Sequence, residues 1–417
     1  MTRFALTIVA LAMGTPVLFA QSECDGERYR YTSTYDNVSV SEGHVFGGNI
    51  NVFGTDIELD FDFYEAVGNG ATDRPLLLVA HGGFFLSGSN NGIDVVPLCE
   101  DFARMGYAVA SFSYRLGIVN ILDLENELIR AVWRAVHDGR AAVRYFRKSV
   151  EEEGNPWGID PDRIYMGGVS AGGFLALHHA YVDSDGEIPS NIDQTAPGMG
   201  GGLEGESGNP GYSSAVAGIF NVSGALKDAD WMAPGDVNLV SVHGTADGTV
   251  PYGTGNVALL GFPVTEVDGS ATLHEQAEEI GLVHCFTTID GAGHVPHITS
   301  NDAYDVTLST IAGALSSWIC ADYPDQCGEY DYTSDIREQL SHAVRMYPNP
   351  ADNGQVTLVH SAADGAWHAR IRDGQGRVVA THSDFGPQAT LELSDLPSGL
   401  YIVEVAEWSW RKPLIVR

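Results

Sequence analysis

The stretch RIYMGGVSAGGFLALHH, residues 163–179, predicts an apolar strand that turns directly into a helix. At the turn stands the motif Gly168-Val169-Ser170-Ala171-Gly172, whose small residues suit a strained backbone with no room for larger side chains. A turn of this kind lifts the Ser170 hydroxyl clear of the sheet and points it at the helix N-terminus. The five-residue pattern alone arises by chance, but in this strand–turn–helix context we interpret Ser170 as a catalytic nucleophile.

On both sides of this turn the sequence alternates between buried strands and amphipathic helices. Continuous apolar runs, typical of strands covered on both faces, occur at residues 76–80, 107–112, 163–169, 215–222, 237–242 and 282–289. Helical patterns lie between them, at residues 95–105, 122–148, 171–182, 271–280 and 302–318. The alternation predicts an α/β fold, a mostly parallel sheet with helices on both faces.

A second glycine motif, His81-Gly82-Gly83-Phe84-Phe85, follows the predicted strand at residues 76–80. Acyl transfer requires backbone N–H groups where the carbonyl oxygen of the substrate becomes an oxyanion, and glycines let the backbone come that close. Together with the motif around Ser170, this one resembles the α/β-hydrolase superfamily, on its carboxylesterase side. The resemblance implies that Gly83, Phe84 and Ala171 donate to the oxyanion and that His81 holds the loop. Many relatives have a third glycine at the position of Phe84, so here a bulky side chain lines or crowds the acyl pocket.

The resemblance also implies the partners of Ser170. Residues 243–251 resemble the acid loop of the family, with Asp247 as the orienting acid, and residues 290–294 resemble its histidine loop, with His294 as general base. The order Ser170, Asp247, His294 is the order used by this fold. His297 is the alternative base, but His294 directly follows the glycine at the loop tip. The mechanism implied needs neither a metal ion nor an organic cofactor.

Other histidines and arginines receive structural roles from the sequence. We expect His243 to be a strand-end residue, and His178 and His179 to lie on a helix surface. The helical segment at residues 137–144 should pack its apolar side chains, with Tyr145 and Phe146, on the sheet and leave its arginines in water. The glycine-rich segment at residues 183–214 is long enough to form part of a rim over Ser170.

Residues 345–417 form a separate β-rich segment with short strands predicted at residues 355–360, 367–371, 377–381, 390–393, 400–405 and 414–416. Three blocks, at residues 346–350, 393–401 and 412–416, resemble the C-terminal sorting domain of the type IX secretion system. The alternative is a carbohydrate-binding sandwich, which usually carries more exposed aromatic residues than the tryptophans found here. The resemblance implies that the type IX secretion machinery is a partner, and the polar linker predicts little interface between the two domains.

The N-terminus carries the pattern of a Sec-type signal peptide. Arg3 precedes an apolar run too short to cross a bilayer, and the segment ends in a small residue, Ala20. We therefore divide the chain into a signal peptide (1–20), an α/β-hydrolase domain (21–320), a linker (321–344) and a β-sandwich sorting domain (345–417). This division predicts a secreted or cell-surface protein exported through the periplasm, without a membrane span.

The net charge and the cysteine content indicate which partners and which compartment suit this protein. The formal net charge is −33, from 55 acidic and 22 basic residues, which disfavours binding to nucleic acid or to anionic lipid. The five cysteines suit an oxidising compartment, and their odd number leaves at least one thiol without an intrachain partner. Cys320 with Cys327, and Cys24 with Cys99, are candidate disulfides, although sequence does not determine connectivity. No cysteine or histidine spacing suggests zinc.

These features together predict a secreted serine carboxylesterase that works through an acyl-enzyme, on short-chain acyl esters or on acetyl or feruloyl esters of polysaccharides. A polyester depolymerase has the same catalytic parts and is the first alternative. A non-catalytic binding relative of the fold is the second, although it would not need a complete triad. A peptidase of the prolyl-oligopeptidase type would need a propeller domain for which the chain has no room.

Overall fold

The computed structural model describes residues 23–323, 327, 344–347, 351, 354–360, 367–384, 388–405 and 410–416. The predicted signal peptide, residues 1–20, and most of the predicted linker, residues 321–344, lie outside the described residues.

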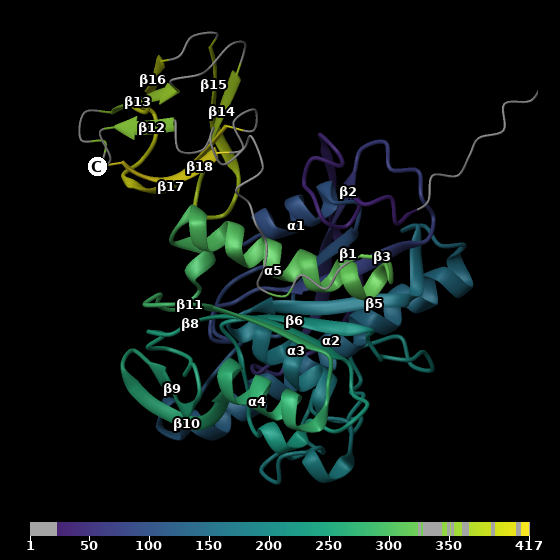
Figure 1. Ribbon diagram of the computed structural model, residues 1–417. Coiled ribbons are helices and arrows are strands. Elements are labelled where there is room, and N and C mark those ends of the chain that lie inside the picture. The colour runs from purple at the N-terminus through teal and green to yellow at the C-terminus, as the bar shows by residue number, and fades with distance from the viewer. Residues whose placement is uncertain are drawn as a thin grey trace, which may run out of the picture.

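An eight-stranded sheet with the strand order β1-β2-β4-β3-β5-β6-β8-β11 forms the centre of the larger domain (Figure 1). Its strands are β1 (Val38–Ile50), β2 (Asp56–Ala66), β3 (Arg74–Ala80), β4 (Ala108–Phe112), β5 (Ile159–Val169), β6 (Gly218–Val222), β8 (Asn238–Gly244) and β11 (His284–Ile289). The neighbours from β4 to β11 are parallel, whereas β1 and β2 add an antiparallel edge. The predicted mostly parallel α/β sheet is confirmed.

Helices cover both faces of this sheet: α1 and α5 lie on one side, and α2, α3 and α4 on the other (Figure 1). Their bounds are α1 (Val96–Arg104), α2 (Leu124–Glu153), α3 (Ala171–Tyr181), α4 (Ser270–Ile280) and α5 (Asn301–Ile319). Alternate residues of β3 face opposite layers, as the pleat of a strand requires. Leu76 and Leu78 belong to the core under α2 and α3, and Leu77 and Val79 to the core under α1 and α5. The continuous apolar run in the sequence therefore reports a strand buried on both faces.

Short elements connect the strands and helices of these layers. They are the 3₁₀ turns η1 (Ile121–Asp123), η2 (Asp185–Glu187), η3 (Ala229–Trp231) and η4 (Pro296–Ile298) and a second sheet, β7 (Ala225–Leu226), β10 (Phe262–Gly269) and β9 (Thr254–Leu259). The β9–β10 hairpin was not predicted. Residues 257–260 are apolar, but Leu260 and Phe262 at its turn are 91% and 74% exposed, so this apolar run does not mark a strand buried on both faces.

The C-terminal region is a sandwich of two antiparallel sheets, in the orders β12-β13-β16 and β15-β14-β17-β18. The strands are β12 (Val344–Tyr347), β13 (Gln355–His360), β14 (Trp367–Arg372), β15 (Val378–Asp384), β16 (Gln388–Glu392), β17 (Gly399–Val405) and β18 (Trp410–Val416). Trp367, Leu358 and Val403 are among the residues that fill its core. The predicted β-rich C-terminal region is confirmed. It contacts the larger domain where Arg372 and Arg411 form ion pairs with Glu100 and Asp101 of α1.

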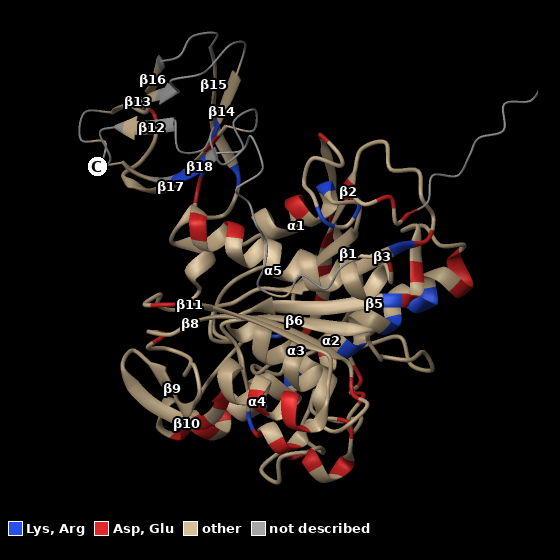
Figure 2. Ribbon diagram, in the orientation of Figure 1, with Lys and Arg blue, Asp and Glu red and all other residues tan. Residues whose placement is uncertain are grey.

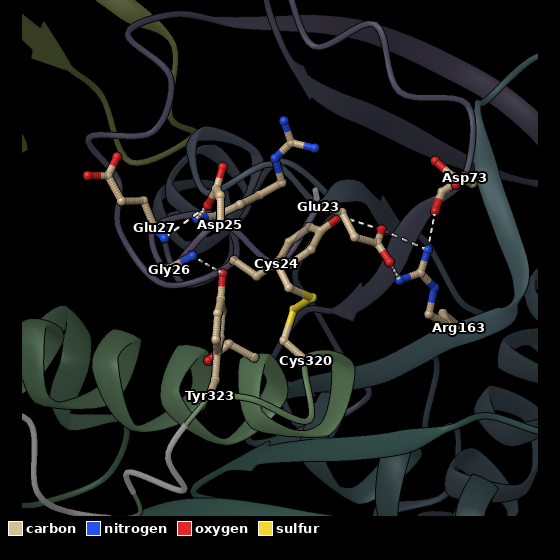
Figure 3. The surroundings of a disulfide bond; sticks show 12 residues. Glu23, Cys24, Asp25, Gly26, Glu27, Asp73, Arg163, Cys320 and Tyr323 are labelled. Carbon is tan, nitrogen blue, oxygen red and sulfur yellow. Dashed lines mark hydrogen bonds and ion pairs between the residues drawn. A yellow bond between two sulfur atoms is a disulfide. The ribbon is translucent and has the colours of Figure 1, made fainter. Parts of the chain in front are cut away.

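Both suggested disulfide pairings are wrong. Cys24 is bonded to Cys320 at the end of α5, and Cys285 in β11 is bonded to Cys327. Figure 3 shows how the first bond holds the N-terminal segment beside α5. Cys99 is a buried free thiol on the side of α1 that packs on the sheet.

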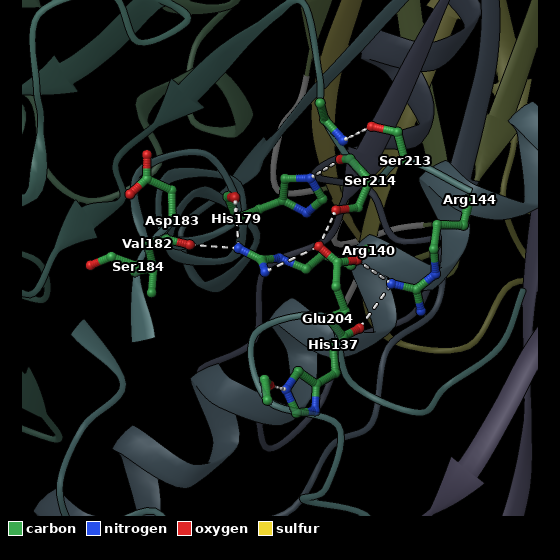
Figure 4. A network of polar contacts seen from close by, with 12 residues as sticks. His137, Arg140, Arg144, His179, Val182, Asp183, Ser184, Glu204, Ser213 and Ser214 are labelled. Carbon is green, nitrogen blue, oxygen red and sulfur yellow. Dashed lines mark hydrogen bonds and ion pairs between the residues drawn. The ribbon is translucent and has the colours of Figure 1, made fainter. Parts of the chain in front are cut away.

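The expectation that the arginines of residues 137–144 lie in water is also wrong. Arg140 and Arg144 are only 4% and 3% exposed, because the segment at residues 198–214 packs over them (Figure 4). Arg144 contacts Glu204 and donates to the carbonyl oxygen of Gly208, while His137 contacts the carbonyl oxygen of Gly202 at 2.8 Å. This part of the glycine-rich segment is therefore built into the scaffold.

The two histidines at the end of α3 are buried too, contrary to the expected surface position. His179 Nε2 lies 2.8 Å from the carbonyl oxygen of Ser214, so the glycine-rich segment also covers this end of α3 (Figure 4). His178 contacts the carbonyl oxygen of Phe174 one turn earlier in the helix.

Candidate active site

Ser170 stands at the turn from β5 into α3 and has the strained backbone angles φ +53° and ψ −113°. Its backbone N–H donates to the carbonyl oxygen of Val222 in the neighbouring strand, at 2.8 Å. A Cβ on Gly172 would overlap the carbonyl oxygen of Ala80, so only glycine lets the helix begin this close to β3. The tight approach holds the Ser170 side chain at the carboxyl end of the sheet.

His294 lies beside Ser170: its Nε2 is 2.8 Å from the serine Oγ. His294 Nδ1 lies 2.7 Å from Asp247 Oδ2. Since the carboxylate can only accept, Nδ1 carries the hydrogen, and Nε2 is free to accept from the serine hydroxyl. The residues come from three loops that follow β5, β8 and β11, and the fold brings all three together.

Asp247 carries the negative charge in this set of contacts. Burial by itself would raise the pKa of the Asp247 carboxyl, but the hydrogen bonds from His243 and His294 outweigh it and hold the pKa well below the usual range. The backbone N–H groups of Thr249 and Val250 donate to the other oxygen, Oδ1, at 2.9 and 3.0 Å. The carboxylate therefore stays ionised and fixed in orientation.

His243 also contacts Asp247. From the sequence we expected only that His243 stands at the end of a strand. Its Nε2 lies 3.2 Å from Asp247 Oδ2, and its Nδ1 lies 2.8 Å from Ser270 Oγ. Asn221 in turn donates to Ser270 Oγ at 3.1 Å. A fully buried polar chain thus runs from β6 through α4 to the acid.

The loop after β3 has the left-handed backbone that a close approach to a ligand requires. Gly83 and Phe84 have φ values of +120° and +57°. Asp94 Oδ2 accepts the N–H of Gly82 at 2.7 Å, and the Tyr114 ring stacks on His81 with 4.4 Å between centroids. Within the described residues, the N–H groups of Gly83, Phe84 and Ala171 donate to no other protein group.

The alternative base, His297, points away from Ser170. Its Nε2 lies 2.9 Å from the carbonyl oxygen of Asp94, and the side chain is buried. Of the two candidate bases in this loop, His294 is the one that contacts Ser170.

Comparison with known proteins finds two families in this chain. Residues 61–200 match the BD-FAE family, and residues 345–416 match the secretion system C-terminal sorting domain. This chain carries a BD-FAE domain, of the α/β-hydrolase esterases, and a type IX sorting domain. The protein is thus an esterase of α/β-hydrolase type with a secretion sorting tail. A tail of this family implies export to the cell surface or beyond.

Solved structures similar to this chain include forms of esterase 2 from Thermogutta terrifontis. The form phosphorylated by paraoxon is 22% identical, with a TM-score of 0.48, over 69% of this chain and 96% of that one. The apo form is 22% identical, with a TM-score of 0.47, over 68% and 95%. The propionate-bound form is 22% identical, with a TM-score of 0.46, over 69% and 96%.

A cavity of about 510 Å³ lies beside α3 in the BD-FAE domain. Phe174 and His178 line it, and they stand four and eight residues after Ser170, on the same face of the helix. The rest of the wall combines aliphatic side chains, such as Leu128 and Val267, with aromatic and polar ones, such as Trp231 and Lys227. Ser170 and His294 are not among the residues that line it. A cavity of this size suits a small organic group.

Two further observations concern metals and membranes. In the part of the chain that the structure describes, no group of three or more His, Cys, Asp or Glu side chains is arranged to hold a metal ion. None of the described helices combines the length and apolar character needed to cross a bilayer.

Proposed function

We propose that the BD-FAE domain hydrolyses carboxylic esters with Ser170 as nucleophile, His294 as general base and Asp247 as the acid that orients it. The contact of 2.8 Å between Ser170 Oγ and His294 Nε2, continued to Asp247 at 2.7 Å, is the observation that supports this assignment. A serine within hydrogen-bond reach of an oriented base is the arrangement that nucleophilic catalysis requires.

In the first half-reaction, Ser170 Oγ attacks the acyl carbon while its proton passes to His294 Nε2. The N–H groups of Gly83, Phe84 and Ala171 are the proposed donors to the oxyanion that forms. Collapse of this intermediate breaks the carbon–oxygen bond to the alcohol, which leaves with the proton from His294. Water then attacks the acyl-enzyme, gives its proton to His294 and releases the acid, and the proton returns to Ser170.

For the substrate, we propose short-chain acyl esters or the acetyl or feruloyl esters of polysaccharides. The match to the BD-FAE family supports this choice. An exported enzyme also meets substrates too large to enter the cell. A polyester depolymerase is the alternative, and activity on aliphatic polyester that exceeds activity on acetylated xylan would favour it.

The test compares the wild type with Ser170→Ala on p-nitrophenyl acetate and butyrate. We expect the variant to lose at least about 10³-fold in kcat, while Ser39→Ala, which changes an exposed serine in β1, keeps wild-type activity. Equal rates for Ser170→Ala and the wild type would refute the assignment. No ester hydrolysis by the wild type, across a panel that includes methyl ferulate and acetylated xylan, would favour a binding role.

We also propose that residues 1–20 direct export across the inner membrane and that residues 345–417 direct the final step through the type IX machinery. In the native host, deletion of residues 345–417 should then leave the enzyme in the periplasm. Arrival of the truncated enzyme in the medium would contradict the sorting role.

A further inference from the structure

The C-terminal sandwich contacts α1 of the larger domain through side chains of opposite charge and contacts α5 through Tyr304. Figure 2 marks the acidic and basic residues along the chain. Arg372 Nη2 lies 3.1 Å from Glu100 Oε1. Arg411 Nη2 lies 3.3 Å from Asp101 Oδ2, and its guanidinium carbon lies 4.2 Å from the centroid of the Tyr304 ring. The Tyr304 hydroxyl donates to the same Asp101 oxygen at 2.7 Å.

The charges on the two sides complement one another. On the side of the larger domain, one excess negative charge comes from Glu100, Asp101 and Arg104. On the side of the sandwich, one excess positive charge comes from Arg372, Arg411 and Glu404. Each of these six side chains is no more than 21% exposed. On a chain with a net charge of −33, a local match of this kind favours one docking geometry over non-specific contact.

The surface of α1 that contacts the sandwich lies next to the loop at residues 81–85, which we call the oxyanion loop. The segment before α1 contains Asp94, whose carboxylate accepts the N–H of Gly82 and whose carbonyl oxygen contacts His297. A small cavity of about 40 Å³ is lined by Ile93 from this segment, by Pro97 in the first turn of α1 and by His297. Its other wall includes Ile402 and Arg411 of the sandwich. Residues 93–97 are therefore held between the oxyanion loop and the C-terminal domain.

We propose that the sorting domain is a docked partner of its own catalytic domain, and that docking positions the oxyanion loop through Asp94. Arg372 and Arg411 are the docking residues, and Glu100, Asp101 and Tyr304 form the receiving surface. The docking itself is independent of the proposed function, whereas its effect on catalysis rests on that function. Removal of the tail would then alter the enzyme as well as its destination.

A charge swap in the full chain tests the docking. Glu100→Arg and Arg372→Glu should each separate the domains, seen as a larger radius of gyration in small-angle scattering and as two thermal transitions in place of one. The double variant Glu100→Arg/Arg372→Glu should restore the compact form at least in part. Glu151→Arg, which reverses an exposed charge at the end of α2, is the matched control and should change neither readout.

Steady-state kinetics on p-nitrophenyl butyrate test the effect on the site. Because oxyanion contacts act in the transition state, undocking should lower kcat about threefold to tenfold with little change in KM, and the charge swap should recover it. An unchanged radius in both single variants would overturn the docking. Undocking without a change in kcat would overturn the positioning role. An inactive wild type would count against the proposed function alone, since the scattering readout does not depend on activity.

Discussion

His243 Nε2 lies 3.2 Å from Asp247 Oδ2, the same carboxylate oxygen that lies 2.7 Å from His294 Nδ1. One acidic oxygen therefore serves two imidazoles, one from the end of β8 and one from the loop after β11. The side chains of His243 and Asp247 are both fully buried, whereas that of His294 is 19% exposed on the side of the candidate nucleophile. His243 thus contacts the Asp247 carboxylate from its buried side, and His294 contacts it from the side of Ser170.

The first prediction concerns His243 as a positioning residue. His243→Phe removes the donor to Asp247, and we expect kcat for p-nitrophenyl butyrate to fall about tenfold with KM nearly unchanged, because a hydrogen bond to a buried charge is lost. His243→Gln can still donate and should recover part of the loss. A purely structural role would instead lower the thermal stability of both variants equally and leave kcat of the folded fraction at the wild-type value.

The second prediction concerns stability at mildly acidic pH. Burial lowers the pKa of His137 and His178 to about 4 and that of His179 and His274 to about 3. In the unfolded chain a histidine takes up its proton near pH 6.5, so below this pH the unfolded state binds more protons than the folded state. Stability is therefore complete above pH 6.5 and falls as the pH decreases toward 4.

His179 offers the clearest measurement of this effect, because its Nε2 contacts the carbonyl oxygen of Ser214 and glutamine can replace that donor. The decrease in Tm from pH 7 to pH 5 should be smaller in His179→Gln than in the wild type by about 3 °C or more. His368→Gln, at an exposed position of the sorting domain, should show the wild-type decrease. Identical pH profiles for His179→Gln and the wild type would rule out this histidine as a source of acid instability.

The third prediction concerns Arg115, which is fully buried together with Asp138. Its guanidinium contacts the Asp138 carboxylate at 2.9 Å and donates to the carbonyl oxygens of Ile50 and Gly198, so it links β1, α2 and the glycine-rich segment. Arg115→Lys keeps the charge but cannot reach all of these acceptors. We expect the free energy of unfolding to fall by about 3 kcal/mol, measured by urea denaturation.

Arg130 provides the control for this prediction. It pairs with Asp123 and Glu127 at the start of α2, and its side chain is 29% exposed. Arg130→Lys should therefore cost less than about 1 kcal/mol, as is usual for ion pairs in contact with solvent. A loss of similar size in both variants would mean that burial does not set the contribution of Arg115.

The sequence indicated the features that local pattern controls. The run Leu76–Ala80 is apolar on both faces because both faces are covered, and Ser170, Asp247 and His294 each follow such a strand. The predictions that were wrong or missing concern contacts between segments that are distant in the sequence. Arg140 resembles a surface arginine until residues 198–214 fold over it, and His243 carries no spacing that links it to Asp247. The β9–β10 hairpin was not predicted, because its apolar residues are largely exposed or half-buried and so do not follow the pattern of a strand covered on both faces.

The last prediction concerns the cysteines. Cys99 is fully buried, and burial raises the pKa of its thiol well above the usual range, so the native protein should not react with Ellman's reagent. The denatured, unreduced protein should release one thiol, and the reduced protein five. Proteolytic cleavage before Asp322 and Asp325 separates Cys320 from Cys327, and mass spectrometry should then find Cys24 linked to Cys320 and Cys285 linked to Cys327.

A peptide linking Cys320 to Cys327, or Cys24 to Cys99, would contradict this connectivity. The Cys24–Cys320 bond also has an energetic consequence, because it joins residues separated by 296 positions and so restricts the unfolded chain strongly. Cys24→Ser/Cys320→Ser should lower the free energy of unfolding by up to about 5 kcal/mol on the chain-entropy estimate. Cys285→Ser/Cys327→Ser removes a bond between residues only 42 positions apart. It should therefore lower the free energy of unfolding by less, which makes it the matched comparison. Equal losses in the two double variants would show that local packing around the bonds, and not loop length, sets their contribution.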